Sequence, residues 1–408
     1  MQNKPIHKKS EYAMHKTPYH SWCTNNFAKG CMQCVKGQKL VVFVTGLCPK
    51  NCFYCPLSEQ KKNHDVIYAN ERKLMDENDT DALMEEASAS KSCGAGITGG
   101  DPLTKIDRTC RYIQLLKHEF GKKFHTHLYT ILESFSEERL KKLDDAGLDE
   151  LRFHPDIVDE RFWNRVALLY TDENSGKDDT KRKYSFDIGI EIPVVPGYYE
   201  ETKKLIEYFI GKIDFVNLNE LEISDTNYFQ LKNKSFHSKN QLSYGVKGSQ
   251  EMALELLSYF NKKYPNANIH YCTCKLKDGV QLRERLRRRA ENTRKPFDIV
   301  THDGTLVRGA IYLDNLKPGF SYIKRLNALK NDDKEKMLEE LIIAKKNIID
   351  EYGVPENMID IDNLKFRLIT NIGIVNRISK DLKRMNLIPA IVEQYPSYDQ
   401  MEVDVEFL

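Results

Sequence analysis

Short apolar runs alternate with helix-like segments between Lys39 and Ile223, and this alternation limits the possible folds more than any other feature. The first run, 39–45, is continuous and rich in β-branched residues, which is typical of a strand buried on both faces. Because parallel strands need long crossover connections, usually helices, the pattern predicts an α/β fold with a partial or full barrel of six β/α units. The predicted strands are 39–45, 94–98, 125–131, 150–154, 186–195 and 215–223, and the predicted helices are 79–90, 106–120, 136–146 and 200–211.

The segments around this core differ in character. We expect residues 1–38 to form a cysteine-rich N-terminal arm and residues 39–225 to form the barrel core. Residues 226–300 are expected to form a lid and a basic helix, and residues 301–408 a small α+β domain. A charged stretch at 171–183 is predicted to be a surface loop. In the last domain the predicted strands are 305–313 and 401–408, and the predicted helices are 333–352 and 374–385.

Composition and charge exclude several classes of protein. The chain has 62 basic and 60 acidic residues, a formal net charge of +2, so the whole molecule has no general attraction for nucleic acids or membranes. With 40% hydrophobic residues it can bury a substantial core. Residues 1–20 lack the apolar stretch of a secretory signal, and the longest apolar run is less than half of the roughly 20 residues that cross a bilayer. We therefore expect a cytoplasmic protein without a membrane span.

The ten cysteines are predicted to be metal ligands or buried thiols, because the reducing cytosol disfavours disulfides. Three of them, Cys48, Cys52 and Cys55, form a CxxxCxxC loop directly after the first strand, and the loop offers no fourth ligand. A four-iron cluster held by three cysteines leaves one iron open for a chelating cofactor or substrate. Residues 99–101 end the next strand, so they are expected at the same edge of the sheet, where ligands gather in such folds.

With this loop, the preceding strand and Gly99-Gly100-Asp101-Pro102, the sequence resembles the radical S-adenosylmethionine (SAM) superfamily over roughly residues 39–225. The resemblance implies a partial (β/α)6 barrel and a [4Fe-4S] cluster whose open iron is chelated by SAM. It also implies that an electron, supplied by a donor such as a ferredoxin or flavodoxin, cleaves a carbon–sulfur bond of SAM. The resulting 5′-deoxyadenosyl radical then abstracts hydrogen from a substrate, so the expected activity is that of an oxidoreductase.

The resemblance also assigns roles to single residues. By it, Cys48, Cys52 and Cys55 are the cluster ligands, and the alternative for this motif is a zinc site. Asp101 stands where the family more often has Glu. The positions that match cofactor contacts are Tyr54 against the adenine, Gly99 and Gly100 beside the methionyl group, Asp101 at the amino group, and Glu191 on a later strand.

The remaining clustered cysteines predict a second metal centre. Cys23, Cys31 and Cys34 precede the first strand at ligand-like spacing, and either Cys272 or Cys274 is placed to complete the set. Both an auxiliary iron–sulfur cluster and a zinc ion fit four thiolates. The role of such a centre would be electron relay, substrate ligation or clamping of the arm onto the barrel, and clamping is the simplest of these interpretations.

The segment 275–295 is rich in lysine and arginine and is predicted to contain an amphipathic basic helix, at about 281–294. Its functional interpretation is a phosphate-contacting surface for RNA or a nucleotide-like substrate, and its structural interpretation is a solvated helix face. His125, His127 and His154 are interpreted as packing residues rather than acid–base groups.

Within the superfamily the sequence is similar to proteins related to pyruvate formate-lyase activating enzymes. This similarity favours a protein or peptide substrate, whereas the basic helix favours RNA, and the sequence leaves both open. The rival hypothesis from another class is a non-catalytic zinc and nucleic-acid-binding protein that uses both cysteine groups structurally.

Overall fold

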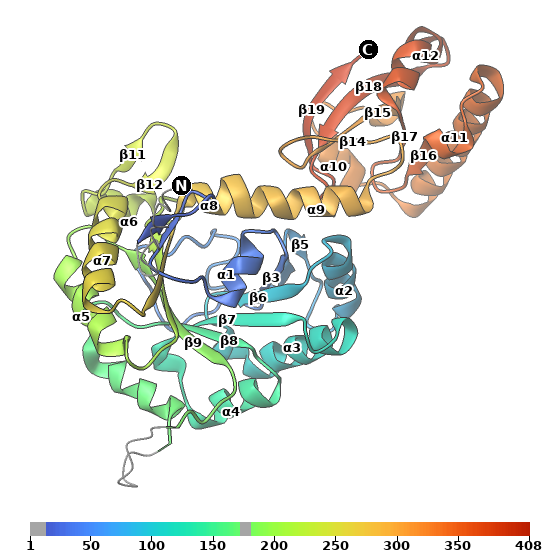
Figure 1. Cartoon of the computed structure of the whole chain (residues 1–408). Coiled ribbons are helices and arrows are strands. Elements are labelled where there is room, and N and C mark those ends of the chain that lie inside the picture. Colours follow the sequence, from blue (N-terminus) through green and yellow to red (C-terminus); the bar gives the residue numbers. More distant parts are fainter. Residues whose placement is uncertain (1–13, 172–180) are drawn as a thin grey trace, which may run out of the picture. The chain divides into compact units, whose positions relative to one another are not determined.

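The structure, a computed structural model, describes residues 14–171 and 181–408 (Figure 1). Residue contacts divide the chain into two units, Met1–Ser88 with Ser92–Leu282, and Ala89–Lys91 with Arg283–Leu408. Most of the predicted surface loop at 171–183 lies outside the described residues. The division into four segments stays a prediction.

The first unit is built on a curved sheet of consecutive parallel strands, each hydrogen-bonded to the next. In sheet order they are β3 (Lys39–Phe43), β6 (Gly94–Thr98), β7 (His125–Ile131), β8 (Glu150–His154), β9 (Asp187–Val194), β10 (Phe215–Glu220) and β13 (Asn268–Cys272). The two edges do not meet. Strand β3 pairs with the short antiparallel β4 (Tyr68–Ala69), which pairs with β5 (Arg72–Lys73), and β13 pairs with β2 (Trp22–Cys23), itself paired with β1 (His15–Lys16). The predicted partial α/β barrel is therefore confirmed, with β13 as an additional parallel strand.

Helices cover the outer face of this sheet (Figure 1). They are α2 (Thr80–Ala89), α3 (Ile106–Phe120), α4 (Glu137–Asp145), α5 (Tyr199–Phe209), α7 (Ser249–Lys263) and two 3-10 helices, η1 (Pro102–Lys105) and η3 (Glu160–Leu169). Alternate strand residues such as Ile97, Leu128 and Ile190 are fully buried in the apolar core that these elements enclose. These outward-facing residues form the apolar pattern from which the sequence predicts the barrel strands.

The inner face of the sheet is polar, although strands that are buried on both faces are usually apolar on both. Lys39, His125, Arg152, Asn217 and His270 are all buried, and each belongs to one of the parallel strands. Burying such groups is costly unless they are hydrogen-bonded to one another or to a ligand. The barrel interior is therefore built for polar interactions.

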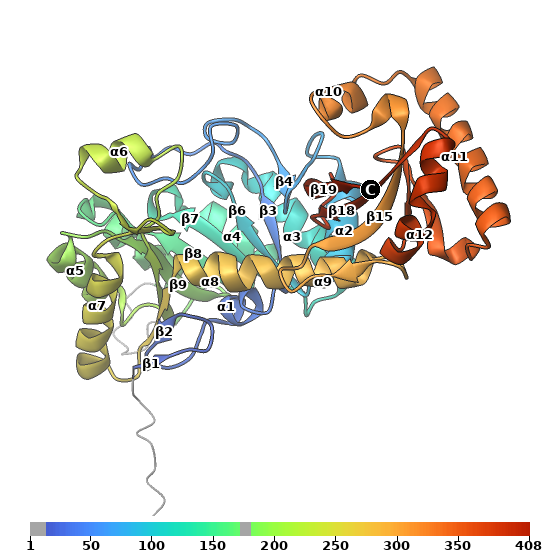
Figure 2. The same ribbon diagram turned by 90° about the horizontal axis from the view of Figure 1, so that it is seen from above.

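The cysteine-rich arm contains the short helix α1 (Lys29–Cys34). The Gly30 amide donates to Glu150 Oε2 over 2.9 Å, and an Arg152 amino group lies 3.3 Å from the Cys31 sulfur. Figure 2 shows α1 and β2 on one side of the strands and α6 (Tyr228–Asn233) on the opposite side. The arm therefore occupies the end of the barrel opposite to the insert that carries α6.

The second unit is a small α+β domain around an antiparallel sheet. Its strands, in sheet order, are β16 (Ile359–Asp362), β17 (Arg367–Thr370), β15 (Leu306–Leu313), β18 (Leu387–Gln394) and β19 (Glu402–Phe407), with β14 (Ile299–Val300) paired to β15. The helices are α9 (Arg283–Thr293), α10 (Tyr322–Asn327), α11 (Asn331–Tyr352) and α12 (Ile372–Arg384), with short 3-10 turns η6 (Asp314–Leu316) and η7 (Glu356–Met358). Residues of β15, β17, α11 and α12 form its apolar core.

The predicted basic helix, at about 281–294, is present as α9 together with the end of the helical turn that precedes it. The chain there forms α8 (Cys274–Leu276), a π-helical turn η5 (Lys277–Leu282) and then α9. Two arginines in and directly after α9 pair with glutamates of the same helix: Glu284 lies 2.8 Å from Arg287, and Glu291 lies 3.2 Å from Arg294. These contacts favour the structural interpretation of the charge pattern.

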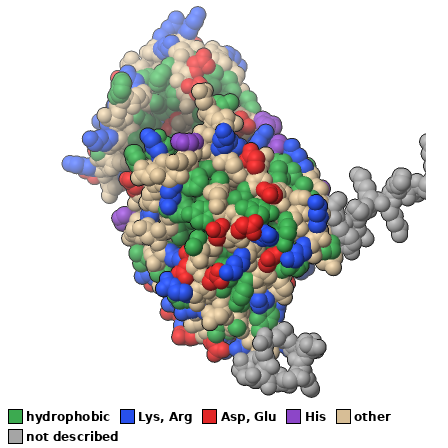
Figure 3. Space-filling model, turned by 90° about the vertical axis from the view of Figure 1, so that its left-hand side faces the viewer, with side chains coloured by type: hydrophobic (Ala, Val, Ile, Leu, Met, Phe, Trp, Pro, Cys, Tyr) green, Lys and Arg blue, Asp and Glu red, His purple; other side chains and the backbone are tan. Residues whose placement is uncertain are grey.

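Basic and acidic side chains are also mixed on other parts of the surface. On the face that carries α5 and α7, basic and acidic side chains are interspersed (Figure 3). Along the described part of the chain, no helix combines the length and the apolar character that a membrane span needs.

Candidate active site

The CxxxCxxC loop is held against the carboxyl ends of β3 and β6 by its own backbone. The Gly100 amide donates to the Thr45 carbonyl over 2.7 Å, and the Asp101 amide donates to the Leu47 carbonyl over 2.8 Å. A Cβ atom at Gly99 would lie 2.4 Å from the Thr45 oxygen, and one at Gly100 would lie 2.4 Å from the Leu47 oxygen. Both positions therefore need glycine, because any side chain would push the cysteine loop away from β6.

A cavity of about 320 Å³ opens where this loop meets the strand ends. It brings together seven of the predicted site residues: Cys48, Cys52, Cys55, Tyr54, Gly99, Gly100 and Glu191. Burial raises the pKa of Cys48 to about 11. In the part of the chain that the structure describes, no three side chains of His, Cys, Asp or Glu converge tightly enough to hold one metal ion. A four-iron cluster needs no such convergence, because each thiolate binds a different iron.

Asp101 takes a different position from the other predicted contacts. Its carboxylate is fully buried and accepts hydrogen bonds from the Thr130 hydroxyl over 2.7 Å and from the Ser134 hydroxyl. It also accepts from the Leu103 amide over 3.2 Å and so caps η1. Asp101 is absent from the cavity lining, so it supports the glycine turn from behind.

Tyr54 is fixed by a chain of hydrogen bonds that starts on β9. One ring nitrogen of His154, Nδ1, lies 3.1 Å from the Glu191 carbonyl, and the other, Nε2, lies 2.7 Å from the Tyr54 hydroxyl. Since a carbonyl only accepts, Nδ1 carries the proton and Nε2 accepts from the tyrosine. Burial lowers the pKa of His154, which agrees with a neutral ring.

The carboxylate of Glu191 faces the cavity and is held by three donors. Arg152 lies 2.8 Å from one oxygen, and the amides of Asn217 and Asn219 each lie 3.0 Å from an oxygen. Burial would raise the pKa of Glu191, but these partners outweigh it and lower the pKa. Glu191 is therefore a fixed anion at the cavity wall.

Three lysines, Lys50, Lys62 and Lys277, also line the cavity, and the sequence motifs did not single them out. Lys50, inside the cysteine loop, forms ion pairs with Glu133 at 2.5 Å and with Asp156 at 3.0 Å. Lys277, at the start of η5, pairs with Glu222 at 3.2 Å on the opposite wall. His154 and Arg152 were also missed as site residues. Their signal was present: polar residues alternate with Leu151 and Phe153 along β8.

The second cysteine group is only partly brought together. Burial is the main cause of the raised pKa of Cys272, and charge on Cys31 and Cys34 adds to it in the same direction. Cys23 instead lies 3.1 Å from a ring nitrogen of His15, and Cys274 lies near Glu222.

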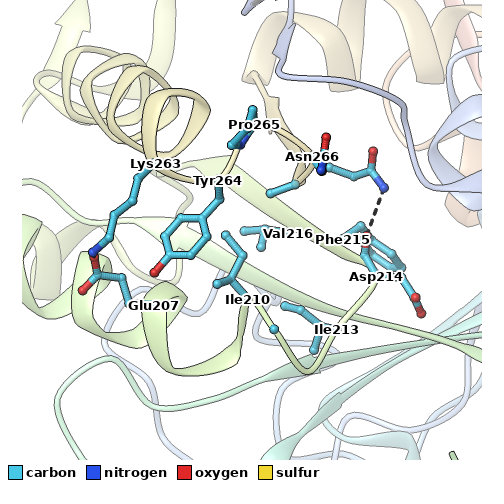
Figure 4. Close-up of a pocket in the computed structure, with 13 residues that line it drawn as sticks. Glu207, Ile210, Ile213, Asp214, Phe215, Val216, Lys263, Tyr264, Pro265 and Asn266 are labelled. Carbon is cyan, nitrogen blue, oxygen red and sulfur yellow. Dashed lines mark hydrogen bonds and ion pairs between the residues drawn. The ribbon is translucent and has the colours of Figure 1, made fainter. Parts of the chain in front are cut away.

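A larger cavity, of about 580 Å³, lies at the amino ends of β10 and β13 (Figure 4). Its lining includes the ion pair of Glu207 and Lys263, at 2.6 Å, with Tyr264 beside it. None of the predicted cofactor residues lines it. The chemistry of the cysteine loop is therefore confined to the smaller cavity.

Comparison with known proteins identifies the family of the chain. The family model of the radical SAM superfamily matches residues 42–209. A protein of Methanocaldococcus jannaschii, named as a candidate glycyl-radical enzyme activating enzyme, is 39% identical over 386 residues, which cover 93% of each chain.

Two further relatives match more weakly. The PqqA peptide cyclase of Bradyrhizobium diazoefficiens is 22% identical over 47% of this chain and 48% of its own length. A biotin synthase of Shewanella loihica is 27% identical over 36% of this chain and 41% of its own length. The rival hypothesis of a non-catalytic zinc and nucleic-acid-binding protein finds no support in these matches. The chain therefore belongs to the radical SAM superfamily and is a radical SAM enzyme, with a [4Fe-4S] cluster and SAM as its cofactors.

Proposed function

We propose that this enzyme reductively cleaves SAM at a [4Fe-4S] cluster held by Cys48, Cys52 and Cys55, and that its substrate is a protein or peptide. The observation that carries the proposal is the cavity that these three cysteines share with Gly99 and Gly100. When bound, the cluster and SAM supply a 5′-deoxyadenosyl radical. The chain's own task is to hold three irons and to leave the fourth accessible from the cavity.

The other cavity residues take positioning roles in this proposal. Tyr54 presents its ring to the adenine, in an orientation that His154 sets through the hydroxyl. Glu191 provides an acceptor for a donor group of SAM, and Arg152 keeps it ionised. Asp101 acts indirectly, because it fixes the turn that contains Gly99 and Gly100.

The proposed substrate class rests on the named relatives and on the ion pairs that the arginines form. The relative that matches along almost the whole chain is named for activating another enzyme, and a weaker relative is named for acting on a peptide. Arg287 and Arg294, two of the basic residues that would contact RNA, form ion pairs with Glu284 and Glu291 instead. Both points favour a polypeptide substrate, with a ferredoxin or flavodoxin as the proposed electron donor.

For the second cysteine group we propose an iron–sulfur cluster that includes Cys31, Cys34 and Cys272, because in the described chain no three side chains converge tightly enough for one zinc ion. Cys31 and Cys34 lie on one turn of α1, at a spacing that suits metal ligands, and Cys272 ends β13. Cys23 and Cys274 lie beside His15 and Glu222 and are left out of this set.

The test of the cluster ligands is the variant C48A/C52A/C55A, purified without oxygen and reconstituted with iron and sulfide. We expect it to lose 5′-deoxyadenosine release, since no thiolate remains to bind the cluster. Its matched control is C110A, because Cys110 lies in α3 and donates only to the Lys142 carbonyl. Full release of 5′-deoxyadenosine by the triple variant would refute the proposal. The metal content of the same variant shows whether the second cysteine group also binds metal.

A further inference from the structure

An insert between β10 and α7 stands beside the mouth of the active-site cavity. It comprises residues 224–248 and contains α6 and a two-stranded hairpin, β11 (Ser238–Asn240) and β12 (Ser243–Val246). Its base is fixed: the buried Asn227 side chain donates to the Tyr54 carbonyl over 3.1 Å and to the Glu222 carbonyl over 3.0 Å. Since Tyr54 and Glu222 both line the cavity, the insert is attached directly to its rim.

A second contact joins the insert to the cysteine loop. The Phe236 ring is parallel to the Phe53 ring within 6°, with 6.4 Å between the centroids. The Lys234 ammonium lies 4.8 Å from the centre of the Phe53 ring. Anything that binds to the insert therefore lies next to the loop that holds the cluster ligands.

The outer part of the insert exposes apolar side chains that take no part in attaching its base to the cavity rim. Leu242 is 99% exposed and Phe229 is 72% exposed, although Leu231 on the same helix is fully buried. Exposed apolar groups of this size beside a functional site are typical of a surface that binds a partner.

The insert is also more positively charged than the rest of the chain. Residues 224–248 contain four lysines and one acidic residue, Asp225, whereas the whole chain of 408 residues has a net charge of only +2. Lys239 is paired with the buried Glu220. The surface charge therefore comes from the three exposed lysines, Lys232, Lys234 and Lys247. A basic surface of this kind favours an acidic partner and increases its rate of association.

Two features select a polypeptide over a nucleic acid. The insert contains no arginine, the residue that recognises phosphates in two-pronged geometry. In the described chain β11 has one neighbour, β12, so the other edge of β11 offers backbone donors and acceptors. An extended peptide can complete such an edge as an added strand, and a nucleic acid cannot.

We propose that the insert is the docking surface for the substrate polypeptide, which binds through an extended acidic segment with apolar side chains. The segment adds to the edge of β11, its apolar groups contact Phe229 and Leu242, and its acidic groups face Lys232, Lys234 and Lys247. This inference rests on the proposed polypeptide substrate and names the chemistry that recognises it.

The test is a binding measurement without SAM, so that its result does not depend on radical chemistry. The full chain is titrated into a fluorescein-labelled random copolymer of Glu and Tyr, followed by fluorescence anisotropy, with polylysine and poly(U) RNA as separate probes. The variant F229S/K232E/L242S changes three exposed residues of the insert, and I343S/K346E is the matched control on the exposed face of α11.

We expect the insert variant to weaken binding of the acidic copolymer by about tenfold or more, and the control to leave it unchanged. Both variants should release 5′-deoxyadenosine from SAM at the normal rate without substrate, which confirms that they are folded. Equal binding of the copolymer by all three proteins, or no binding at all, would overturn the inference. Tighter binding of poly(U), lost in the insert variant, would overturn it in favour of RNA.

Discussion

His154 illustrates how a buried residue can determine the geometry of a site without touching the reacting atoms. Its two ring nitrogens connect the Glu191 carbonyl to the Tyr54 hydroxyl, at 3.1 Å and 2.7 Å. The pattern of the sequence favoured a packing role. The structure adds a directional role, because the carbonyl partner determines which nitrogen carries the proton.

Replacing His154 with Phe should raise the KM for SAM by about tenfold, because the lost hydrogen bond leaves the Tyr54 ring free to rotate. Iron content should stay at the level of the unmodified enzyme, since no cluster ligand changes. H154Q should recover much of the affinity, because the glutamine amide can reach the position of Nε2. An H154F variant with unchanged KM would show that the tyrosine does not need this partner.

The two glycines of the turn after β6 give a prediction about folding rather than chemistry. G99A and G100A each place a methyl group 2.4 Å from a backbone oxygen of the cysteine loop, so each should destabilise the protein by about 1–3 kcal/mol and reduce cluster loading. G211A is the control, because nothing lies within 4 Å of its new Cβ. Thermal unfolding and iron analysis measure both effects, and equal behaviour of G99A and G211A would contradict the account.

At the residue scale, the spacing of Cys48, Cys52 and Cys55 was enough to predict the group that shares the cavity. Asp101 was predicted from its place in the motif, but the direction of its side chain depends on Thr130 and Ser134, which come from β7 and the short 3-10 turn after it. A local motif cannot contain that information.

Among the helices and strands, the strands whose outward-facing residues are all apolar were predicted well. β6, β7 and β8 begin and end at the predicted residues. Strand β13 was missed because its inward-facing residues are polar, as in Asn268 and His270, and no apolar run marks it. The basic helix was predicted within two residues of α9 at each end, but the charge pattern does not show the π-helical turn at Lys277–Leu282 that precedes it.

Lys39, at the start of β3, should make the stability of the folded protein depend on pH. Its ammonium lies 2.7 Å from His125 Nδ1, and burial lowers the pKa of Lys39 to about 7 from an ordinary 10.5. Between those values the unfolded chain holds the proton and the folded chain does not, so the free energy of unfolding should rise with pH across this range.

The measurement compares urea unfolding of the unmodified protein and of K39M at pH 7, 8 and 9. Methionine has a similar length and no charge, so K39M should lack this contribution and the difference between the two proteins should change with pH. Parallel pH profiles would show that Lys39 keeps its ordinary pKa in the folded state.

At the scale of the whole molecule, composition excluded a general affinity for anionic polymers but could not locate charge. The net charge of +2 conceals the basic insert at 224–248, and only the fold places that insert beside the cavity. The substrate is therefore a question about one surface rather than about the overall charge of the protein.

The central claim is that the cluster keeps one iron free of protein ligands, and that SAM occupies it. The most direct measurement is electron–nuclear double resonance on the reduced, oxygen-protected enzyme with SAM labelled with ¹⁵N in the amino group and ¹⁷O in the carboxylate. We predict strong hyperfine coupling from both labels, which means that both groups bind iron. Absence of both couplings in a cluster-loaded sample, with a fourth side chain at that iron instead, would contradict the account.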